Sequence, residues 1–140
     1  MKISARNVLQ GEVKEVARGA VNAEITLALQ GGELITAIIT NASATSLELA
    51  KGKRAFAIAK ASEVMIGKGL EAAKLSARNI LAGEVAHVTP GAVNSEIVVR
   101  LPGGTEIVAS ITKASVEALE LRSGDRVSAV IKASNVLIGV

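Results

Sequence analysis

Ser4-Ala5-Arg6-Asn7 occurs a second time in the chain as Ser76-Ala77-Arg78-Asn79, 72 residues further on. Shifting the sequence by this offset aligns its two halves without a gap, and 37 of the 67 aligned positions are identical. Self-similarity at a fixed period indicates that a chain repeats one structural unit. We therefore expect two copies of one domain, at residues 1–68 and 74–140, joined by a short linker at residues 69–73.

Each copy is small for an independent domain, because about 70 residues give only a marginal hydrophobic core. The 140-residue chain has no cysteine and one histidine, so neither a disulfide framework nor a thiolate or imidazole metal cage can support the fold. Aliphatic residues supply the apolar volume, since Phe56 is the only aromatic. We expect copy to stabilise copy within the chain, and chain to associate with chain.

The charge pattern favours neither nucleic acid nor a membrane as a partner. The formal net charge is +3, and opposite charges alternate along the sequence instead of forming blocks. No apolar run approaches the roughly 20 residues of a membrane span, and the N-terminus does not read as a secretory signal. We expect a soluble cytoplasmic protein.

Alternation of apolar and polar residues predicts strands, most cleanly from Val21 to Leu29. Gly31 and Gly32 then predict a hairpin turn into the next strand. The strands expected in the first copy are 9–14, 21–29, 34–39, 54–59 and 64–66. Those expected in the second copy are 80–88, 93–101, 106–111, 126–131 and 136–138.

One short helix is expected in each copy, after Thr40 and after Thr112. Its spacing fits one to two turns, with Thr40 or Asn41 as N-cap and with Gly52 at the end. Three strands, a helix and two strands make up a five-stranded Greek-key barrel of the OB type. The sequence therefore predicts a mainly β protein with two tandem OB-like five-stranded barrels, each with one short helix.

The side chains that usually carry catalysis are scarce. Asp125 is the only aspartate and His87 the only histidine, and the chain has no cysteine or tyrosine, so the usual pairs of nucleophile and base are missing. His87 also has no counterpart, because Glu15 stands at the equivalent position. We expect no catalytic residues, no enzymatic activity and no side chains that bind a metal directly.

The blocks that are identical in both copies offer hydrogen-bond donors. They contain arginine and lysine cations, serine and threonine hydroxyls, and small residues that let backbone N–H groups approach a ligand. Thr40-x-x-Ser43 adds a helix N-terminus, where free N–H groups favour negative charge. Since donors without acceptors suit an anion, and each charge-assisted bond contributes about 1.5–3 kcal/mol, a small dianion is the expected ligand.

Purely structural roles explain the same blocks. The Thr-x-x-Ser pairs serve as helix caps in many proteins, and the lysines of the Lys-Ala-Ser blocks fit ordinary solvated strand ends. Arg6 and Arg78 also suit pairing with glutamates at a domain contact, and Gly19 to Asn22 suits a turn. Repetition in both copies does not separate a ligand contact from a shared interface role.

Four blocks in order resemble the Mop domain, a TOBE-like module. They are the Ser-Ala-Arg-Asn opening, the Gly-Ala-Val-Asn-x-Glu segment, the Thr-x-x-Ser helix start and the Lys-Ala-Ser block, and together they cover nearly the whole of both copies. The tandem arrangement is similar to a molbindin of the di-Mop kind. The resemblance implies OB-like barrels in a homotrimer that binds molybdate, and also tungstate, for storage and homeostasis, without an organic cofactor.

The resemblance also implies two types of oxyanion site at domain and subunit interfaces. The first type would be lined in the first copy by Ser4, Arg6, Asn7, Thr40, Ser43, Lys60, Ala61 and Ser62. In the second copy it would be lined by Ser76, Arg78, Asn79, Thr112, Ser115, Lys132, Ala133 and Ser134. The second type, near the symmetry axis, would use Gly19, Ala20, Val21, Asn22, Gly91, Ala92, Val93 and Asn94. Since Ser95 replaces Ala23 and Asn135 replaces Glu63, the halves are expected to bind unequally.

A site made only of donors selects among oxyanions. Molybdate is a dianion without a proton at neutral pH, whereas phosphate keeps a proton that needs an acceptor, so such a site disfavours phosphate. Sulfate passes this filter, because it is also a tetrahedral dianion without a proton. Selectivity against sulfate must therefore come from the size of a rigid cavity.

Two other functions remain open. An OB barrel is common in nucleic-acid-binding modules, but these normally stack bases on aromatic side chains in a basic groove, and Phe56 is the only aromatic here. The second alternative keeps the ligand and changes the role to sensing, as in the regulatory domains of molybdate-responsive transcription factors or transporter ATPases.

Overall fold

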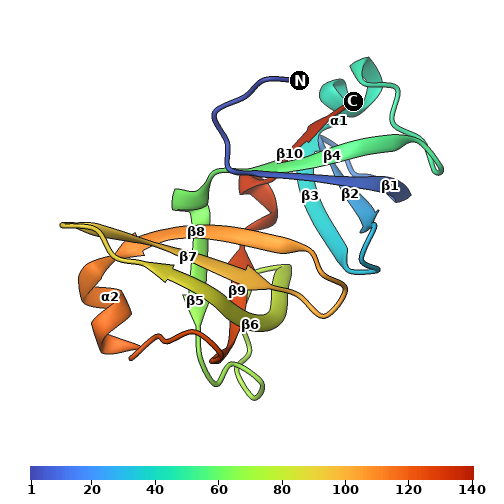
Figure 1. Cartoon of the computed structure of the whole chain (residues 1–140). Coiled ribbons are helices and arrows are strands. Elements are labelled where there is room, and N and C mark those ends of the chain that lie inside the picture. Colours follow the sequence, from blue (N-terminus) through green and yellow to red (C-terminus); the bar gives the residue numbers. More distant parts are fainter.

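The alternating stretches form antiparallel strands in the computed structural model, which describes residues 1–140 (Figure 1). The first repeat contains β1 (Asn7–Arg18), β2 (Asn22–Leu29), β3 (Leu34–Thr40), α1 (Asn41–Ser46), β4 (Arg54–Ala59), the 3-10 turn η1 (Ala61–Glu63) and β5 (Val64–Gly67). The second contains β6 (Asn79–Thr89), β7 (Asn94–Arg100), β8 (Glu106–Thr112), α2 (Lys113–Ala118), β9 (Arg126–Ile131), η2 (Ala133–Asn135) and β10 (Leu137–Gly139). No helix has the length and apolar character that crossing a bilayer requires.

The predicted fold class is confirmed, because the strands form two curled five-stranded sheets that match tandem OB-like domains. Curling brings the first strand of each repeat very close to the second. A Cβ atom on Gly11 would lie 2.6 Å from the carbonyl oxygen of Ala28, and one on Gly83 would lie 2.6 Å from that of Arg100. Glycine is therefore required at these two positions, where neighbouring strands approach each other closely.

Each repeat gives its fifth strand to the sheet of the other repeat. The strand orders are β10-β4-β1-β2-β3 and β5-β9-β6-β7-β8. Val64 in β5 lies opposite Ile131, and Leu137 in β10 lies opposite Ile58. Figure 1 shows β5 running into one sheet and β10 into the other. Five strands per sheet were expected, whereas the exchange was not.

The chain crosses between the sheets at η1 and η2. Residues 68–78 instead connect β5 to β6, which lie in one sheet, so the stretch 69–73 that was expected to link the barrels joins two strands of the same sheet. The domain boundaries taken from the repeat stay a prediction. The Lys-Ala-Ser blocks occupy both crossings, which gives their repetition a structural reason as well as a functional one.

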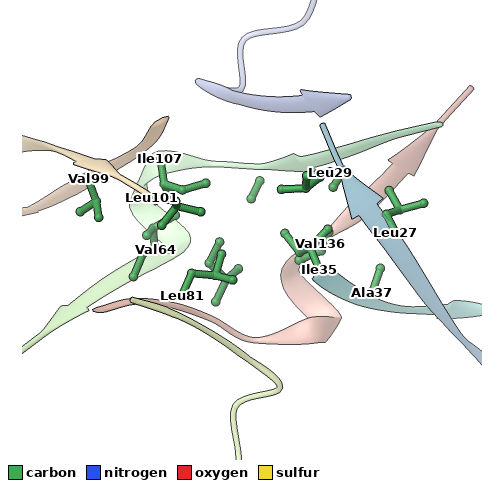
Figure 2. Packing of buried hydrophobic residues seen from close by; sticks show 14 of the residues in the cluster. Leu27, Leu29, Ile35, Ala37, Val64, Leu81, Val99, Leu101, Ile107 and Val136 are labelled. Carbon is green, nitrogen blue, oxygen red and sulfur yellow. The ribbon is translucent and has the colours of Figure 1, made fainter. Parts of the chain in front are cut away.

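One continuous hydrophobic core joins both repeats. It contains 25 buried residues drawn from both sheets. Figure 2 shows Val136, just before β10, in the same region of the cluster as Ile35 and Leu29, while Val64 lies near Leu101. Burying one such side chain contributes about 1.5–3 kcal/mol, so the exchanged segments give each repeat stability that it would lack alone.

The helices end earlier than the sequence suggested. Helix α1 stops at Ser46, and Gly52 belongs to a later turn. The N–H group of Leu49 donates to the carbonyl oxygen of Ala44 at 3.0 Å, and Glu48 adopts a positive φ of 50°. These are the marks of a Schellman cap, with glutamate in the place that glycine usually takes.

A lysine donates to the carbonyl groups behind each helix, but from different places in the sequence. After α1, Lys53 Nζ donates to the carbonyl oxygen of Leu47 at 2.6 Å. The residue equivalent to Lys53 is Asp125, which cannot donate in this way. After α2, Lys68 supplies the cation, because its Nζ atom lies 3.0 Å from the carbonyl oxygen of Glu120 and 2.9 Å from Asp125 Oδ2.

Two buried asparagines tie each repeat to the third strand of the other. Asn79 Oδ1 accepts from the Thr36 N–H at 2.7 Å, and Nδ2 donates to the carbonyl oxygens of Thr36 at 2.8 Å and Ile131 at 3.1 Å. Asn7 makes the equivalent pair with Val108 at 2.7 and 2.8 Å. The side-chain amide therefore acts as a short piece of neighbouring strand.

Asn79→Ala is expected to lower the free energy of unfolding by about 3 kcal/mol, because it leaves buried backbone groups of Thr36 and Ile131 without partners. Chemical denaturation measures the loss. Gln10→Ala, which removes an exposed amide without a hydrogen bond in the chain, is the control and should change stability by less than about 0.5 kcal/mol. A loss below about 1 kcal/mol for Asn79→Ala would contradict the bridging role.

Candidate anion-binding sites

The first and last blocks of each repeat meet at one end of its sheet. Asn7, the first residue of β1, pairs with Ala59, the last residue of β4. Residues 4–6 and 60–62 therefore extend from adjacent strand ends. Asn79 and Ile131 make the same pair in the second repeat.

These paired blocks lie against the third strand of the other repeat. The turn η1 packs on β8, and η2 packs on β3. Arg78 contacts Glu24, which pairs with Ile38, two residues before Thr40. Two residues of a strand span roughly 7 Å, so the Arg78 guanidinium lies beside a point on β3 that is roughly 7 Å from Thr40.

The predicted first-type residues are thus arranged across the repeats rather than within one copy. We call them two donor groups. The N-terminal donor group is Ser4, Arg6, Lys60 and Ser62 with Thr112 and Ser115. The C-terminal donor group is Ser76, Arg78, Lys132 and Ser134 with Thr40 and Ser43. No hydrogen bond within the chain joins either Thr-x-x-Ser pair to the rest of its group.

Several donors are free for a ligand. The serine and lysine side chains of the Ser-Ala-Arg-Asn and Lys-Ala-Ser blocks are exposed and make no hydrogen bond within the chain. Lys60 and Lys132 stand at the N-caps of η1 and η2 without using their side chains there. Ala61 and Ala133 lie in the two turns, where they bring only backbone donors and a small side chain.

Asn7 and Asn79, which the resemblance placed among the ligand residues, are occupied elsewhere. Both are buried, and Asn79 already uses both amide hydrogens in bonds to Thr36 and Ile131. Within the chain they link the repeats and position the blocks beside them.

Each arginine is held by a glutamate of the other repeat. Arg78 Nη1 and Nη2 both lie 2.7 Å from the Glu24 carboxylate, and Arg6 makes the same fork with Glu96 at 2.6 and 3.0 Å. The hydrogen bond from Arg78 lowers the pKa of Glu24, and the carboxylate raises the pKa of Arg78 in return. Glu96 likewise raises the pKa of Arg6.

The structure therefore shows the purely structural role considered for the two arginines, which is an ion pair with a glutamate at the contact between the repeats. Both ion pairs are substantially exposed, so solvent weakens them. Sequence reasoning did not assign Glu24 and Glu96 to the site. The available signal was their presence in both copies, two residues after Asn22 and Asn94.

The Thr-x-x-Ser pairs are N-caps that still present a hydroxyl. Thr40 is the cap of α1, because its Oγ1 atom accepts from the Ser43 N–H at 3.0 Å and donates to Ser43 Oγ at 2.8 Å. Thr112 and Ser115 repeat this arrangement at the start of α2. Since the cap uses the Ser43 N–H and the Asn41 N–H donates to the carbonyl oxygen of Val21, the Ser43 hydroxyl and the Ala42 N–H are the donors left at this helix start.

The Gly-Ala-Val-Asn turns present backbone donors. The N–H groups of Ala20 and Val21 donate to nothing within the chain, and neither do those of Ala92 and Val93. Val21 and Val93 are 71% and 75% exposed, so these turns project from the surface. Two consecutive free N–H groups form a surface on which an anion binds well.

The cation beside each turn comes from a different position. Arg18 flanks the first turn, and its Nη1 atom donates to the carbonyl oxygen of Asn41 at 3.3 Å and to Thr45 Oγ1 at 3.1 Å. In the second repeat Pro90 replaces Arg18, while Lys113 replaces Asn41. The two turns therefore keep similar charge but differ in geometry.

Comparison with protein families places both repeats. The TOBE domain model matches residues 3–66 and residues 75–138. The chain belongs to the TOBE domain family. The crystal structure of the cytoplasmic molybdate-binding protein ModG, with molybdate bound, matches this chain with a TM-score of 0.96. The two are 50% identical, and the match covers 100% of this chain and 99% of that one.

Two relatives match this chain over its whole length, and a third matches one half of it. The molybdenum-pterin-binding protein MopA of Rhodobacter capsulatus is 45% identical over 140 residues, and the molybdenum transport protein ModE of Azotobacter vinelandii is 41% identical over the same span. The chain covers 53% and 52% of these proteins, so it spans about half their length. A probable molybdenum-pterin-binding protein of Haemophilus influenzae is 43% identical over 67 residues, which are 97% of that protein.

Arg78→Ala is expected to raise the pKa of Glu24 toward its ordinary range, because the largest cause of its lowering is the hydrogen bond from Arg78. In the wild type the pair stabilises the fold above the ordinary glutamate pKa, and that stabilisation is lost as the pH falls through the lowered value. An NMR titration of the Glu24 carboxyl carbon measures the change. Arg100→Ala removes a different exposed partner, that of Glu106, and should leave the Glu24 titration in place.

Proposed function

We propose that this chain binds molybdate, and also tungstate, as intact oxyanions for storage and homeostasis in the cytoplasm, and that it is a binding protein rather than an enzyme. The observation that carries the proposal is the full-length likeness to a molybdate-binding protein at 50% identity. The free polar groups of the repeated blocks support it, because they are cations, hydroxyls and backbone N–H groups.

In this proposal the two donor groups form the first type of site. Lys60 and Ser62 supply a cation and a hydroxyl from one repeat, while Ser115 supplies a hydroxyl from the other. Asn7 and Ala61 keep these groups in place. The C-terminal donor group works in the same way, and the turns at residues 19–22 and 91–94 form the second type of site.

Binding at the first type of site requires the arginine to be shared. Arg6 and Lys60 bring two positive charges, while Glu96 brings one negative charge. A dianion gains more from the guanidinium than a single carboxylate does, so it competes for Arg6. Three charge-assisted hydrogen bonds at the upper end of the range of about 1.5–3 kcal/mol each sum to about 9 kcal/mol, which corresponds to an affinity near the micromolar range.

A neighbouring chain completes the sites in the proposed homotrimer. The free donors are exposed in the single chain, where solvent weakens their attraction for an anion. Exposed apolar side chains mark surfaces that suit contact with another chain. Four such side chains recur at equivalent positions in the two repeats, as Ile3 and Leu75, Val8 and Ile80, Val21 and Val93, and Met65 and Leu137.

Selectivity follows from the same donors. Phosphate keeps a proton at neutral pH that needs an acceptor, and the carboxylate in the site, Glu96, is already engaged by Arg6, so phosphate binding costs an imperfectly paired hydrogen bond. Sulfate has no such proton, and only its smaller size distinguishes it from molybdate. The buried asparagine bridges fix the spacing between the repeats and therefore the size of the cavity.

Molybdate should raise the melting temperature of the protein, because a ligand that binds only the folded state stabilises it by about 2.7 kcal/mol at 100 times its dissociation constant. Scanning calorimetry with molybdate, tungstate and sulfate at equal concentrations measures the effect, and sulfate should do little. An unchanged melting temperature with molybdate would remove the basis of the proposed function.

Lys60→Ala combined with Lys132→Ala should lower the number of molybdate ions bound per oligomer, because each first-type site loses its free cation. Native mass spectrometry counts the ions and the chains together. The matched control is Lys14→Ala with Lys51→Ala, which removes the same charge from exposed lysines outside both donor groups. Unchanged stoichiometry in the Lys60 and Lys132 variant would assign these lysines a structural role only.

A further inference from the structure

The two repeats are related by an approximate two-fold axis that passes through a few side chains. A residue that contacts its own repeat equivalent lies on such an axis. The backbones of Gly31 and Gly103 are in close contact, and so are the residues of two further pairs that are 72 positions apart. Those two pairs are Glu33 with Thr105, and Glu63 with Asn135.

Both polar pairs on the axis are unequal. Glu33 accepts from the Gly103 N–H at 2.9 Å and from the Thr105 hydroxyl at 3.3 Å. Asn135 Nδ2 donates to Glu63 Oε2 at 3.0 Å. In each pair the N-terminal repeat provides the carboxylate and the C-terminal repeat provides the donor.

Most of the other contacts between the repeats do not distinguish one repeat from the other. The exchanged strands, the asparagine bridges and the Arg–Glu pairs each occur twice, once in each direction. Two N-terminal repeats from different chains would form all of them, since Asn7, Arg6 and Glu24 are present in each. These contacts hold repeats together without choosing the partner.

A third unequal contact lies off the axis. Lys68 of the N-terminal repeat binds Asp125 of the C-terminal repeat at 2.9 Å. The residue equivalent to Asp125 is Lys53. A pair of N-terminal repeats would therefore place Lys68 beside Lys53, which are like charges.

We propose that these three contacts select the partner for strand exchange, so that an N-terminal repeat accepts a C-terminal repeat, of its own chain or of a second copy, and rejects another N-terminal repeat. Pairing of two N-terminal repeats would bring Glu33 against Glu33 and Glu63 against Glu63. Like charges in direct contact disfavour that pairing, which is how many specific interfaces exclude wrong partners. The selection does not depend on the bound anion.

The selection has a clear use. A pair of like repeats always takes its two members from different chains, because each chain has one N-terminal and one C-terminal repeat. A pair of unlike repeats can form within one chain, as it does here. The observed contacts therefore favour a closed molecule.

The test uses three variants of the full chain. The carboxylate variant, Thr105→Glu with Asn135→Glu, makes the N-terminal and C-terminal faces alike and acidic. The neutral variant, Glu33→Thr with Glu63→Asn, makes them alike and uncharged. The exchanged variant, Glu63→Asn with Asn135→Glu, reverses one pair and keeps it complementary, so it is the matched control.

At neutral pH the carboxylate variant should melt at least about 4 °C below the wild type, and the gap should narrow as the pH falls toward 4 and the carboxylates take up protons. The exchanged variant should stay within about 2 °C of the wild type. A carboxylate variant as stable as the wild type, or an exchanged variant that loses as much as the carboxylate variant, would overturn the proposal.

A cross-link reports the pairing directly, because the native chain has no cysteine. Glu24→Cys is placed in the carboxylate variant and Arg78→Cys in the neutral variant, because these two residues are in contact across the repeats. A short bis-maleimide then joins two chains only where the N-terminal repeat of the carboxylate variant pairs with the C-terminal repeat of the neutral variant. After the two are refolded together, the cross-linked heterodimer should be several-fold more abundant than with the same cysteines in two wild-type chains.

Equal cross-linking in the two experiments would show that the axis contacts do not select a partner. If the carboxylate variant fails to fold alone, recovery of folded, cross-linked protein only in the presence of the neutral variant supports the proposal. Failure to fold in that mixture as well counts against it.

Discussion

The exchange of fifth strands holds the two repeats together. Neither sheet has its fifth strand without the other repeat, and the single core takes buried side chains from both. The bridges from Asn7 and Asn79 then fix the spacing, because a side-chain amide that replaces a strand's backbone tolerates little displacement. The positions of the polar blocks follow from this, since those blocks begin or end the strands that the asparagines hold.

Much of the fold was accessible from the sequence. Alternation marked the strands, and Thr40, which is the cap of α1, was one of the two residues expected in that role. The exchange was not accessible, because the residues of β5 and β10 are apolar in the same pattern, and that pattern does not indicate which of the two sheets each strand joins. The early end of α1 was missed for a local reason. Glu48 takes the left-handed conformation that sequence reasoning reserves for glycine, and so Gly52 seemed the natural stop.

The candidate site shows where repetition stops being informative. Repetition identified the blocks of the candidate site, but it could not tell that the blocks of one repeat face the third strand of the other. It also gave Asn79 and Lys60 equal weight, although burial separates them in the structure, with one amide fully engaged and one ammonium free. Differences between the copies are informative as well. Glu33 contacts Thr105 and Glu63 contacts Asn135, and identical glutamates at these positions would have repelled each other.

Placing both exchanging strands in one polypeptide removes dilution as a variable. Two separate domains must find each other, and the fraction that is paired falls when the protein is scarce. A covalent tether instead holds the partners at an effective concentration on the order of millimolar, whatever the abundance of the chain. The paired barrels therefore persist in a cell that makes few copies, and only the contacts between chains remain sensitive to supply.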